Sequence, residues 1–126
     1  MNVVDSSGWL EYFAGGTNAS FFAPAITETD SLIVPTICIY EVFKRLLIQR
    51  GEEDALQAVG VMSLGILAEL TREISVNAAQ ISAELRMAMA DSIILSTTHV
   101  HNAMLWTQDA DFKGMQGVQY VEKLST

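Results

Sequence analysis

The sequence predicts one α/β domain with a mainly parallel central sheet of about four to five strands, flanked by helices on both faces. Three observations support this. The chain has 126 residues, close to one average domain, and 50% of them are hydrophobic, enough for one core. Short apolar runs alternate with helical patterns along its length, as expected for parallel strands joined by helices. Neither a repeat nor a linker interrupts it, so we expect residues 1–126 to form a single domain.

The chain begins with a strand, an acidic residue and a helix. Residues 2–4 are Asn-Val-Val and predict a strand that ends at Asp5. Ser6 or Ser7 is the expected N-cap of the following helix. Gly15 is expected to end that helix, because glycine readily adopts the left-handed conformation at a helix C-terminus.

The next segments predict a helix, a strand and a longer helix. Residues 19–26 predict a short helix, in which Pro24 reduces the regularity. Residues 32–34 predict a buried strand that Pro35 stops. Residues 37–49 carry apolar side chains at helical spacing and predict the third helix.

The middle of the chain predicts three more helices around one weak strand. Residues 52–62 open with acidic side chains, which suit the positive end of a helix dipole. A strand is expected within residues 64–71. Helices are expected over residues 77–89 and 91–100, and the pattern leaves open whether these two are continuous.

The last strands place a second acidic residue at the sheet edge. Residues 103–106 predict a strand that leads to Asp109, and residues 118–121 predict an edge strand after a turn. In parallel sheets ligands bind beyond the carboxyl ends of the strands. We therefore expect Asp5 and Asp109 to point into the same crevice.

Two other acidic residues have apolar neighbours on both sides. They are Glu41 in TICIYEVF and Asp91 in MAMADSIIL, and a carboxylate in such a setting is costly without a partner. Glu41 has Lys44 and Arg45 within one helical turn as candidate partners. Asp91 has none within four positions, although it could cap the following helix, just as Asp109 could be a turn residue.

A cluster of carboxylates requires a compensating charge. At an assumed separation of about 5 Å and an effective dielectric of about 20, two carboxylates repel by roughly 3 kcal/mol. Such a cluster binds cations or has raised pKa values. Carboxylate oxygens favour hard ions, so Mg²⁺ or Mn²⁺ is the expected cofactor.

The charge balance narrows the class of function. The chain has seven Lys and Arg residues and 15 Asp and Glu residues. The net charge of −8 argues against a broad basic DNA-binding face.

The N-terminus resembles no secretion signal and no apolar segment could cross a bilayer, so we expect a cytoplasmic protein with no membrane partner. The single cysteine, Cys38, lies in an apolar run and is expected to be buried and inert.

Four segments together resemble the PIN domain family. The segments NVVDSSGWLEYF, PTICIYEVFKRL, ADSIILSTT and LWTQDADF have the order and approximate spacing of that family's motifs. The closest resemblance is to the VapC toxins of toxin–antitoxin modules, which are compact PIN domains of about this length. The resemblance implies a catalytic and metal-binding set composed of Asp5, Glu41, Asp91 and Asp109.

The same resemblance implies the supporting residues and the activity. Asp111 is a candidate fifth acid, and Ser6 and Thr107 are candidate supporting hydroxyls. The implied activity is that of a divalent-metal-dependent endoribonuclease, in which a metal-activated water hydrolyses an RNA phosphodiester bond and leaves 5′-phosphate and 3′-hydroxyl ends. Candidate RNA phosphate contacts are the basic residues Lys44, Arg45, Arg50, Arg86 and Lys113.

The implied partners and two alternative functions complete the predictions. A VapB-like antitoxin is expected to inhibit the toxin by bringing a basic side chain to the acidic pocket, and a homodimer is expected. One alternative is a PIN-fold binding or assembly module without autonomous nuclease activity. The other is a phosphotransfer or phosphatase domain with Asp5 as nucleophile, for which the expected lysine near a late strand is missing.

Overall fold

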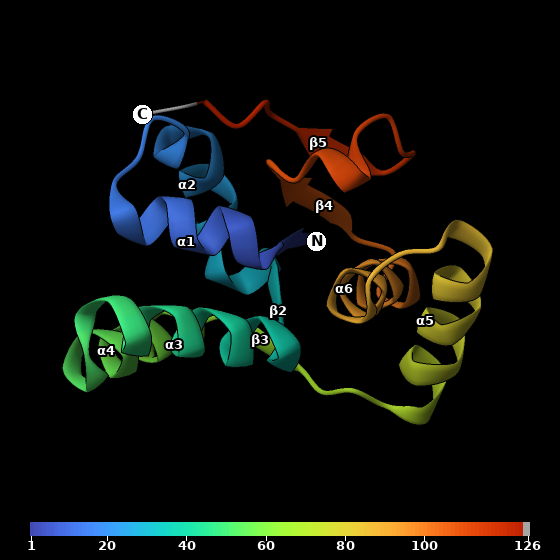
Figure 1. Cartoon of the computed structure of the whole chain (residues 1–126), viewed down its shortest axis with the longest axis horizontal. Helices are drawn as coiled ribbons and strands as arrows, with labels where there is room; N and C mark the ends of the chain where they lie inside the picture. The colour runs from blue at the N-terminus through green and yellow to red at the C-terminus, as the bar shows by residue number, and fades with distance from the viewer. Residues whose placement is uncertain (125–126) are drawn as a thin grey trace.

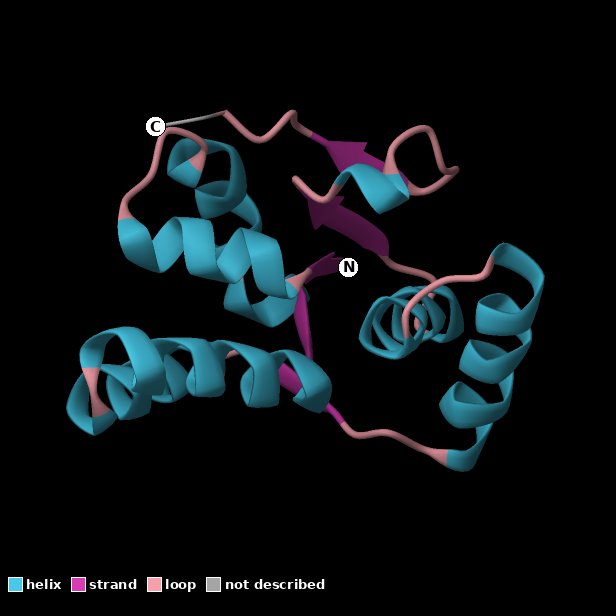
Figure 2. Cartoon of the chain, viewed as in Figure 1, coloured by secondary structure: helices cyan, strands magenta, loops and turns pink. Residues whose placement is uncertain are grey.

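The protein is described by a computed structural model that covers residues 1–124 (Figure 1). Within them lie one five-stranded sheet, six α-helices and two short 3-10 helices, η1 and η2 (Figure 2). The elements in chain order are β1 (Asn2–Val4), α1 (Ser6–Ala14), α2 (Ala19–Thr27), η1 (Thr29–Ser31), β2 (Leu32–Pro35), α3 (Thr36–Arg50), α4 (Glu52–Met62), β3 (Ile66–Ala68), α5 (Arg72–Leu85), α6 (Met89–Val100), β4 (Met104–Thr107), η2 (Ala110–Phe112) and β5 (Val118–Tyr120).

The sheet is entirely parallel, which confirms the predicted fold class. Its strand order is β3-β2-β1-β4-β5, so the first strand of the chain lies at the centre. Val3 is in register with Ile33 of β2 and with Leu105 of β4. The chain therefore moves outward from β1 to β3 and then returns past β1 to β4.

This reversal separates the helices into two layers. Helices α1 to α4 lie on one side of the sheet, and α5 and α6 lie on the other (Figure 1). The arrangement follows from the right-handedness of parallel crossovers, because a connection that runs in the opposite direction must cover the opposite face. Strands β1 and β4 are the neighbours at which the direction reverses, and ligands bind at such points in open α/β sheets.

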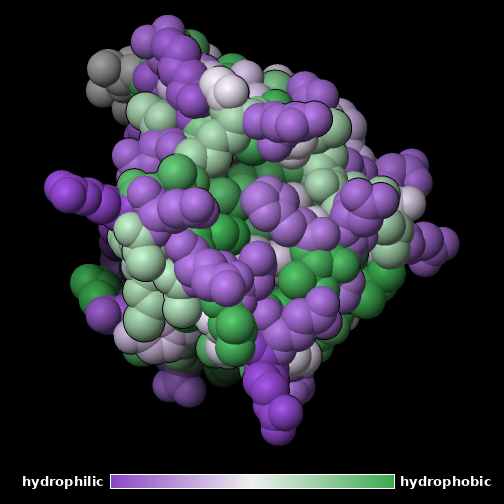
Figure 3. Space-filling model, turned by 90° about the vertical axis from the view of Figure 1, so that its right-hand side faces the viewer, coloured by the Kyte–Doolittle hydropathy of each residue, from purple (hydrophilic) through white to green (hydrophobic). Residues whose placement is uncertain are grey.

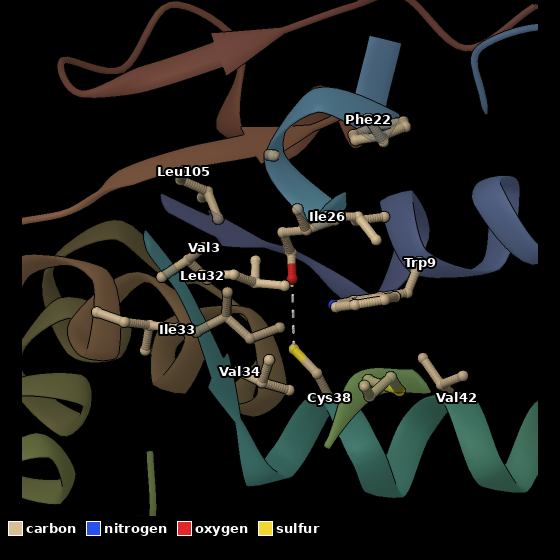
Figure 4. Close-up of a cluster of buried hydrophobic side chains, with 14 of the residues drawn as sticks. Val3, Trp9, Phe22, Ile26, Leu32, Ile33, Val34, Cys38, Val42 and Leu105 are labelled. Carbon is tan, nitrogen blue, oxygen red and sulfur yellow. Dashed lines mark hydrogen bonds between the residues drawn. The ribbon is translucent and has the colours of Figure 1, made fainter. Parts of the chain in front are cut away.

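The main core packs both helical layers against the sheet, and its largest part lies on the side of α1 to α4. Val3, Leu105 and Trp9 are fully buried in it, together with Cys38 of α3 (Figure 4). The Cys38 thiol donates to the carbonyl of Val4 at 3.8 Å. Burial raises the pKa of this thiol far above its ordinary value, so Cys38 is a packing residue, as predicted.

Two predicted helix starts are wrong. The N-cap of α1 is Asp5, not Ser6 or Ser7, because its carboxylate accepts the backbone N–H of Gly8 at 2.9 Å. A helix was predicted over residues 77–89, but α5 already begins at Arg72, since Thr71 caps it by accepting the N–H of Ile74, and it ends at Leu85.

The boundary between α5 and α6 also settles the role of Asp91 in its helix. Arg86 follows α5 with a left-handed φ of 53°, so the two helices are separate. Ala88 precedes the first residue of α6, which places Asp91 inside the first turn. Asp91 is therefore not the helix cap that its sequence position allowed.

The molecular surface mixes polar and apolar residues. On the face that carries α5, hydrophobic surface lies between hydrophilic side chains (Figure 3). Across residues 1–124, we find no helix that has both the length and the apolar character of a membrane span.

Candidate active site

The four predicted acidic residues line one cleft at the carboxyl edge of the sheet. Asp5 follows β1, Asp109 lies two residues beyond β4, Glu41 lies on α3 and Asp91 lies in the first turn of α6. The cleft has a volume of about 600 Å³, and all four side chains contribute to its wall. Segments from both halves of the sequence thus meet beside β1 and β4, the neighbouring strands at which the strand order reverses.

Asp5 is the most completely held of these carboxylates. It is only 2% exposed. Its Oδ1 accepts the N–H of Gly8 at 2.9 Å and the hydroxyl of Ser7 at 2.8 Å, and its Oδ2 accepts the hydroxyl of Thr107 at 2.6 Å. Burial nevertheless raises the pKa of Asp5 to about 6, and these hydrogen bonds only partly oppose the effect. A cation near Asp5 would favour its ionised form.

Three other carboxylates form the tightest group. They belong to Asp91, Asp109 and Asp111. One carboxylate oxygen from each residue lies within 4.8 Å of the other two oxygens. Burial, together with the negative charges of Asp109 and Asp111, raises the pKa of Asp91 to about 6. Asp109 caps η2 by accepting the N–H of Asp111 at 2.9 Å, which holds the two carboxylates on one short turn.

Glu41 forms a hydrogen bond with Ser6, and not with the candidate partners Lys44 and Arg45 on its own helix. The hydroxyl of Ser6 donates to Glu41 Oε1 at 2.6 Å and so connects the start of α1 to α3. Lys44 and Arg45 are exposed and line the cleft with Glu41. The structure thus brings Ser6 to Glu41, and it leaves both basic residues at the cleft surface.

Thr107 connects the two acidic residues that follow strands. Its side chain is fully buried, and its hydroxyl donates to Asp5 while it accepts the backbone N–H of Asp109 at 2.9 Å. Because one hydroxyl makes both bonds, the positions of Asp5 and Asp109 are coupled. The structure thus brings Thr107 into contact with both acidic residues.

The sequence reasoning missed several residues that organise the site. Ser7 donates to both carboxylate oxygens of Asp5, at 2.8 and 2.9 Å. Its position two residues after an acid at a strand end was the available signal, because Asp and Ser often hydrogen-bond locally at such turns.

A second missed group fixes the wall of the cleft next to Asp109. The amide of Asn18 donates to Gln108 Oε1 and to the carbonyl of Glu122, both at 3.0 Å. Glu11 accepts the N–H of Asn18 at 2.9 Å and also lines the cleft. The partners in this network are distant in the sequence, so the only sequence signal for it was the polar residue Gln108 directly after the strand.

The basic residues are concentrated on this cleft despite the net negative charge. The chain has seven Lys and Arg residues, and four of them line the cleft: Lys44, Arg45, Arg50 and Lys123. Arg86 and Lys113, which were also considered as phosphate contacts, are not among its lining residues. The cleft therefore has an acidic part, suited to cations, and a basic part, suited to anions.

The donor set of the acidic part fits a hard divalent cation. Its candidate ligands are carboxylate oxygens, and the groups of Asp91, Asp109 and Asp111 are close enough to share one ion. The raised pKa values of Asp5 and Asp91 fit the same interpretation, since a bound cation stabilises the ionised form of both.

Comparison with known proteins identifies the architecture. The family model of the PIN domain matches residues 3–118. A toxin–antitoxin complex from Klebsiella pneumoniae contains a chain with a TM-score of 0.80 and 20% sequence identity, and the match covers 94% of this chain and 96% of that one. No curated protein sequence matches.

Two other solved structures show the same fold. VapC20 of Mycobacterium tuberculosis, described as a sarcin-ricin loop cleaving toxin, has a TM-score of 0.74 at 14% identity, over 89% of this chain and 92% of that one. VapBC2 of Rickettsia felis, bound to a DNA fragment from its promoter, has a TM-score of 0.75 at 12% identity, over 96% and 97% of the two chains.

Proposed function

The chain belongs to the PIN domain family, and from this premise we propose that it is a divalent-metal-dependent endoribonuclease. One observation carries the proposal. Carboxylates from four separate segments line the same cleft as four of the seven basic residues. A site for RNA hydrolysis needs both, because it must hold cations at the reacting phosphate and neutralise the phosphates on either side.

We assign metal binding to Asp5, Glu41, Asp91 and Asp109, with Asp111 as a fifth ligand, and we expect Mg²⁺ or Mn²⁺. An ion held by these residues would acidify a water that serves as nucleophile, and would stabilise the charge that develops on the phosphate oxygens. Thr107 and Ser7 hold the carboxylate of Asp5 through their hydroxyls, and Ser6 holds that of Glu41.

The basic residues have a separate task in this proposal. Lys44 and Arg45 are exposed on the same cleft wall as Glu41, where they bind phosphates that flank the scissile bond. Hydrolysis then leaves 5′-phosphate and 3′-hydroxyl ends. None of these assignments requires a nucleophilic side chain.

We further propose that the protein is the toxin of a VapBC pair in the cytoplasm. The support is the fold, because similar structures include a toxin–antitoxin complex and VapBC2, and another is described as a sarcin-ricin loop cleaving toxin. In this proposal a VapB-like antitoxin inhibits the enzyme by bringing a basic side chain to the acidic part of the cleft. A homodimer is the proposed form of the toxin.

The test is RNA cleavage by the antitoxin-free protein with Mg²⁺, with Mn²⁺ or with EDTA. The substrates are tRNA, rRNA fragments and single-stranded RNA. We expect cleavage only with metal, and a loss of about 100-fold or more in the Asp91→Asn variant because a ligand is removed.

Asp54→Asn is the matched control, because Asp54 is also an acid in the first turn of a helix but does not line the cleft. This variant should cleave like the unmodified chain. Equal losses in both variants, or cleavage that persists in EDTA, would contradict the assignment. Intact RNA despite metal binding and native folding would favour the alternative of a binding or assembly module.

A further inference from the structure

Tyr40 is a large aromatic residue that the fold leaves exposed at the cleft. It is 59% exposed, lies directly before Glu41 on α3 and contributes to the cleft wall. None of the hydrogen bonds that organise the acidic residues involves it. Its ring is therefore available to a ligand that occupies the cleft.

The neighbours of Tyr40 on α3 give this ring a charged setting. Lys44 lies one helical turn further along, about 6 Å along the axis, and Arg45 follows it on the cleft side. The ammonium of Lys44 lies 5.8 Å from the centre of the Tyr40 ring. This stretch of α3 therefore presents, in order, an aromatic ring, a carboxylate and two cations.

Arg50 and Lys123 extend the positive charge beyond this stretch, within a chain whose net charge is −8. A ligand that combines negative charges with flat aromatic groups would match both features. Proteins that bind single-stranded nucleic acids combine a basic groove with aromatic rings on which unpaired bases stack.

We propose that Tyr40 stacks on an unpaired base of the RNA substrate, while Lys44 and Arg45 bind its neighbouring phosphates. This inference rests on the proposed ribonuclease function and adds to it a residue that holds an unpaired base of the substrate. In a duplex both faces of each base are covered by its neighbours, so the ring can contact a base only after that base has left the stack.

A protein segment is the competing occupant of this surface. The position of Tyr40 on the same stretch of α3 as two cations favours RNA, because a ligand here must satisfy ring and cations together. A bound protein would need acidic and apolar groups in the same arrangement, and Ile48 of α3, which is 75% exposed and also lines the cleft, would give it one further apolar contact. The experiment is therefore designed to separate the two.

The experiment measures binding rather than cleavage. Fluorescence anisotropy with Ca²⁺ in place of Mg²⁺ gives the affinity for a labelled single-stranded oligoribonucleotide and for the same sequence in a duplex. A 2-aminopurine base in the strand reports stacking through quenching. We expect Tyr40→Ala to weaken single-strand binding about tenfold or more and to abolish quenching, and Tyr40→Phe to retain both.

Tyr120→Ala is the matched control. The ring of Tyr120 also has an ammonium 5.8 Å from its centre, that of Lys113, but neither residue lines the cleft. This variant should bind RNA within about twofold of the unmodified chain. Thermal unfolding of each variant verifies that it is folded.

Several outcomes would overturn the inference. They are unchanged RNA binding in Tyr40→Ala, equal losses in Tyr40→Ala and Tyr120→Ala, equal affinity for duplex and single strand, or a Tyr40→Ala defect confined to a protein partner. Metal-dependent cleavage that is unaffected by Tyr40→Ala would remove the inference and leave the ribonuclease function intact. Tyr40-dependent RNA binding without cleavage would support stacking and remove the ribonuclease function.

Discussion

The acidic and basic parts of the cleft differ in how their side chains are held. Asp5 is 2% exposed and accepts hydrogen bonds from three residues, and Thr107 behind it is fully buried. Lys44 and Arg45 instead extend from α3 into solvent. The acidic part is fixed before any ligand arrives, as a reaction site requires. The exposed side chains of the basic part can adjust their positions when a ligand binds.

Within the acidic part, two residues reach the same pKa for different reasons. The pKa is about 6 for both Asp5 and Asp91. For Asp5 burial dominates and hydrogen bonds oppose it, whereas for Asp91 burial and the neighbouring carboxylates act in the same direction. A cation would relieve the repulsion around Asp91, while the hydrogen bonds hold Asp5 with or without it.

Among the residues that hold the carboxylates, the largest effect is expected from the hydroxyl that couples Asp5 to Asp109. Thr107→Val retains the side-chain shape but removes a donor to Asp5 and an acceptor for the Asp109 N–H. We expect cleavage to fall about 10- to 100-fold, as for other residues behind metal ligands. The free energy of unfolding should fall by about 1–3 kcal/mol. Initial rates and urea unfolding measure the two effects.

Two variants make this prediction specific to the site. Thr107→Ser keeps the hydroxyl and should recover most of the activity. Thr98→Val removes another buried hydroxyl, one that donates only to the carbonyl of Ile94 within α6, and should leave cleavage unchanged. If Thr107→Val cleaves RNA at the normal rate, the fixed geometry of the acidic part is not needed for activity.

A smaller effect is expected from pH in the metal-free protein. The pKa of Asp5 rises from 3.8 to about 6 on folding, so the unfolded chain ionises first as pH increases. Stability from this group is therefore complete below pH 4 and is lost as pH rises through 6. Between pH 5 and 7.5 the loss from Asp5 is about 1 kcal/mol, and Asp91 shifts stability in the same direction.

Urea unfolding in EDTA at several pH values measures this loss. Asp5→Asn should flatten the profile, whereas Asp54→Asn should not. Mg²⁺ should raise stability most at pH 7.5, where the carboxylates are ionised. A profile that rises with pH in EDTA would contradict the electrostatic account of the acidic part.

Much of the fold could be predicted from local pattern. Apolar runs bounded by Gly, Pro or acidic residues gave the strands, and their alternation with helices gave a parallel sheet. The start of α5 was missed because Thr71 and a weakly apolar first turn set it, and the apolar pattern becomes clear only later. Such boundaries depend on short polar capping residues, which the periodicity of apolar residues does not reveal.

The candidate site was predictable only in part. Asp5 and Asp109 could be placed together because both follow strands at one edge of the sheet. Glu41 and Asp91 came from the family resemblance and their apolar surroundings. The bond from Ser6 to Glu41 and the network around Asn18 and Gln108 join distant parts of the chain. One sequence contains no signal for such tertiary pairs.

The smallest effect is expected in the basic part, where Lys44→Gln should change binding without changing the chemical step. We expect KM for single-stranded RNA to rise about threefold with kcat unchanged, and the salt dependence of log K to lose about 0.7 of slope, as for one phosphate contact. Lys113→Gln is the control, because Lys113 lies outside the cleft wall. Affinities between 50 and 200 mM salt, with rates at saturating RNA, measure both quantities. A fall in kcat at constant KM would place Lys44 with the acidic residues, because only groups that act in the transition state lower kcat alone.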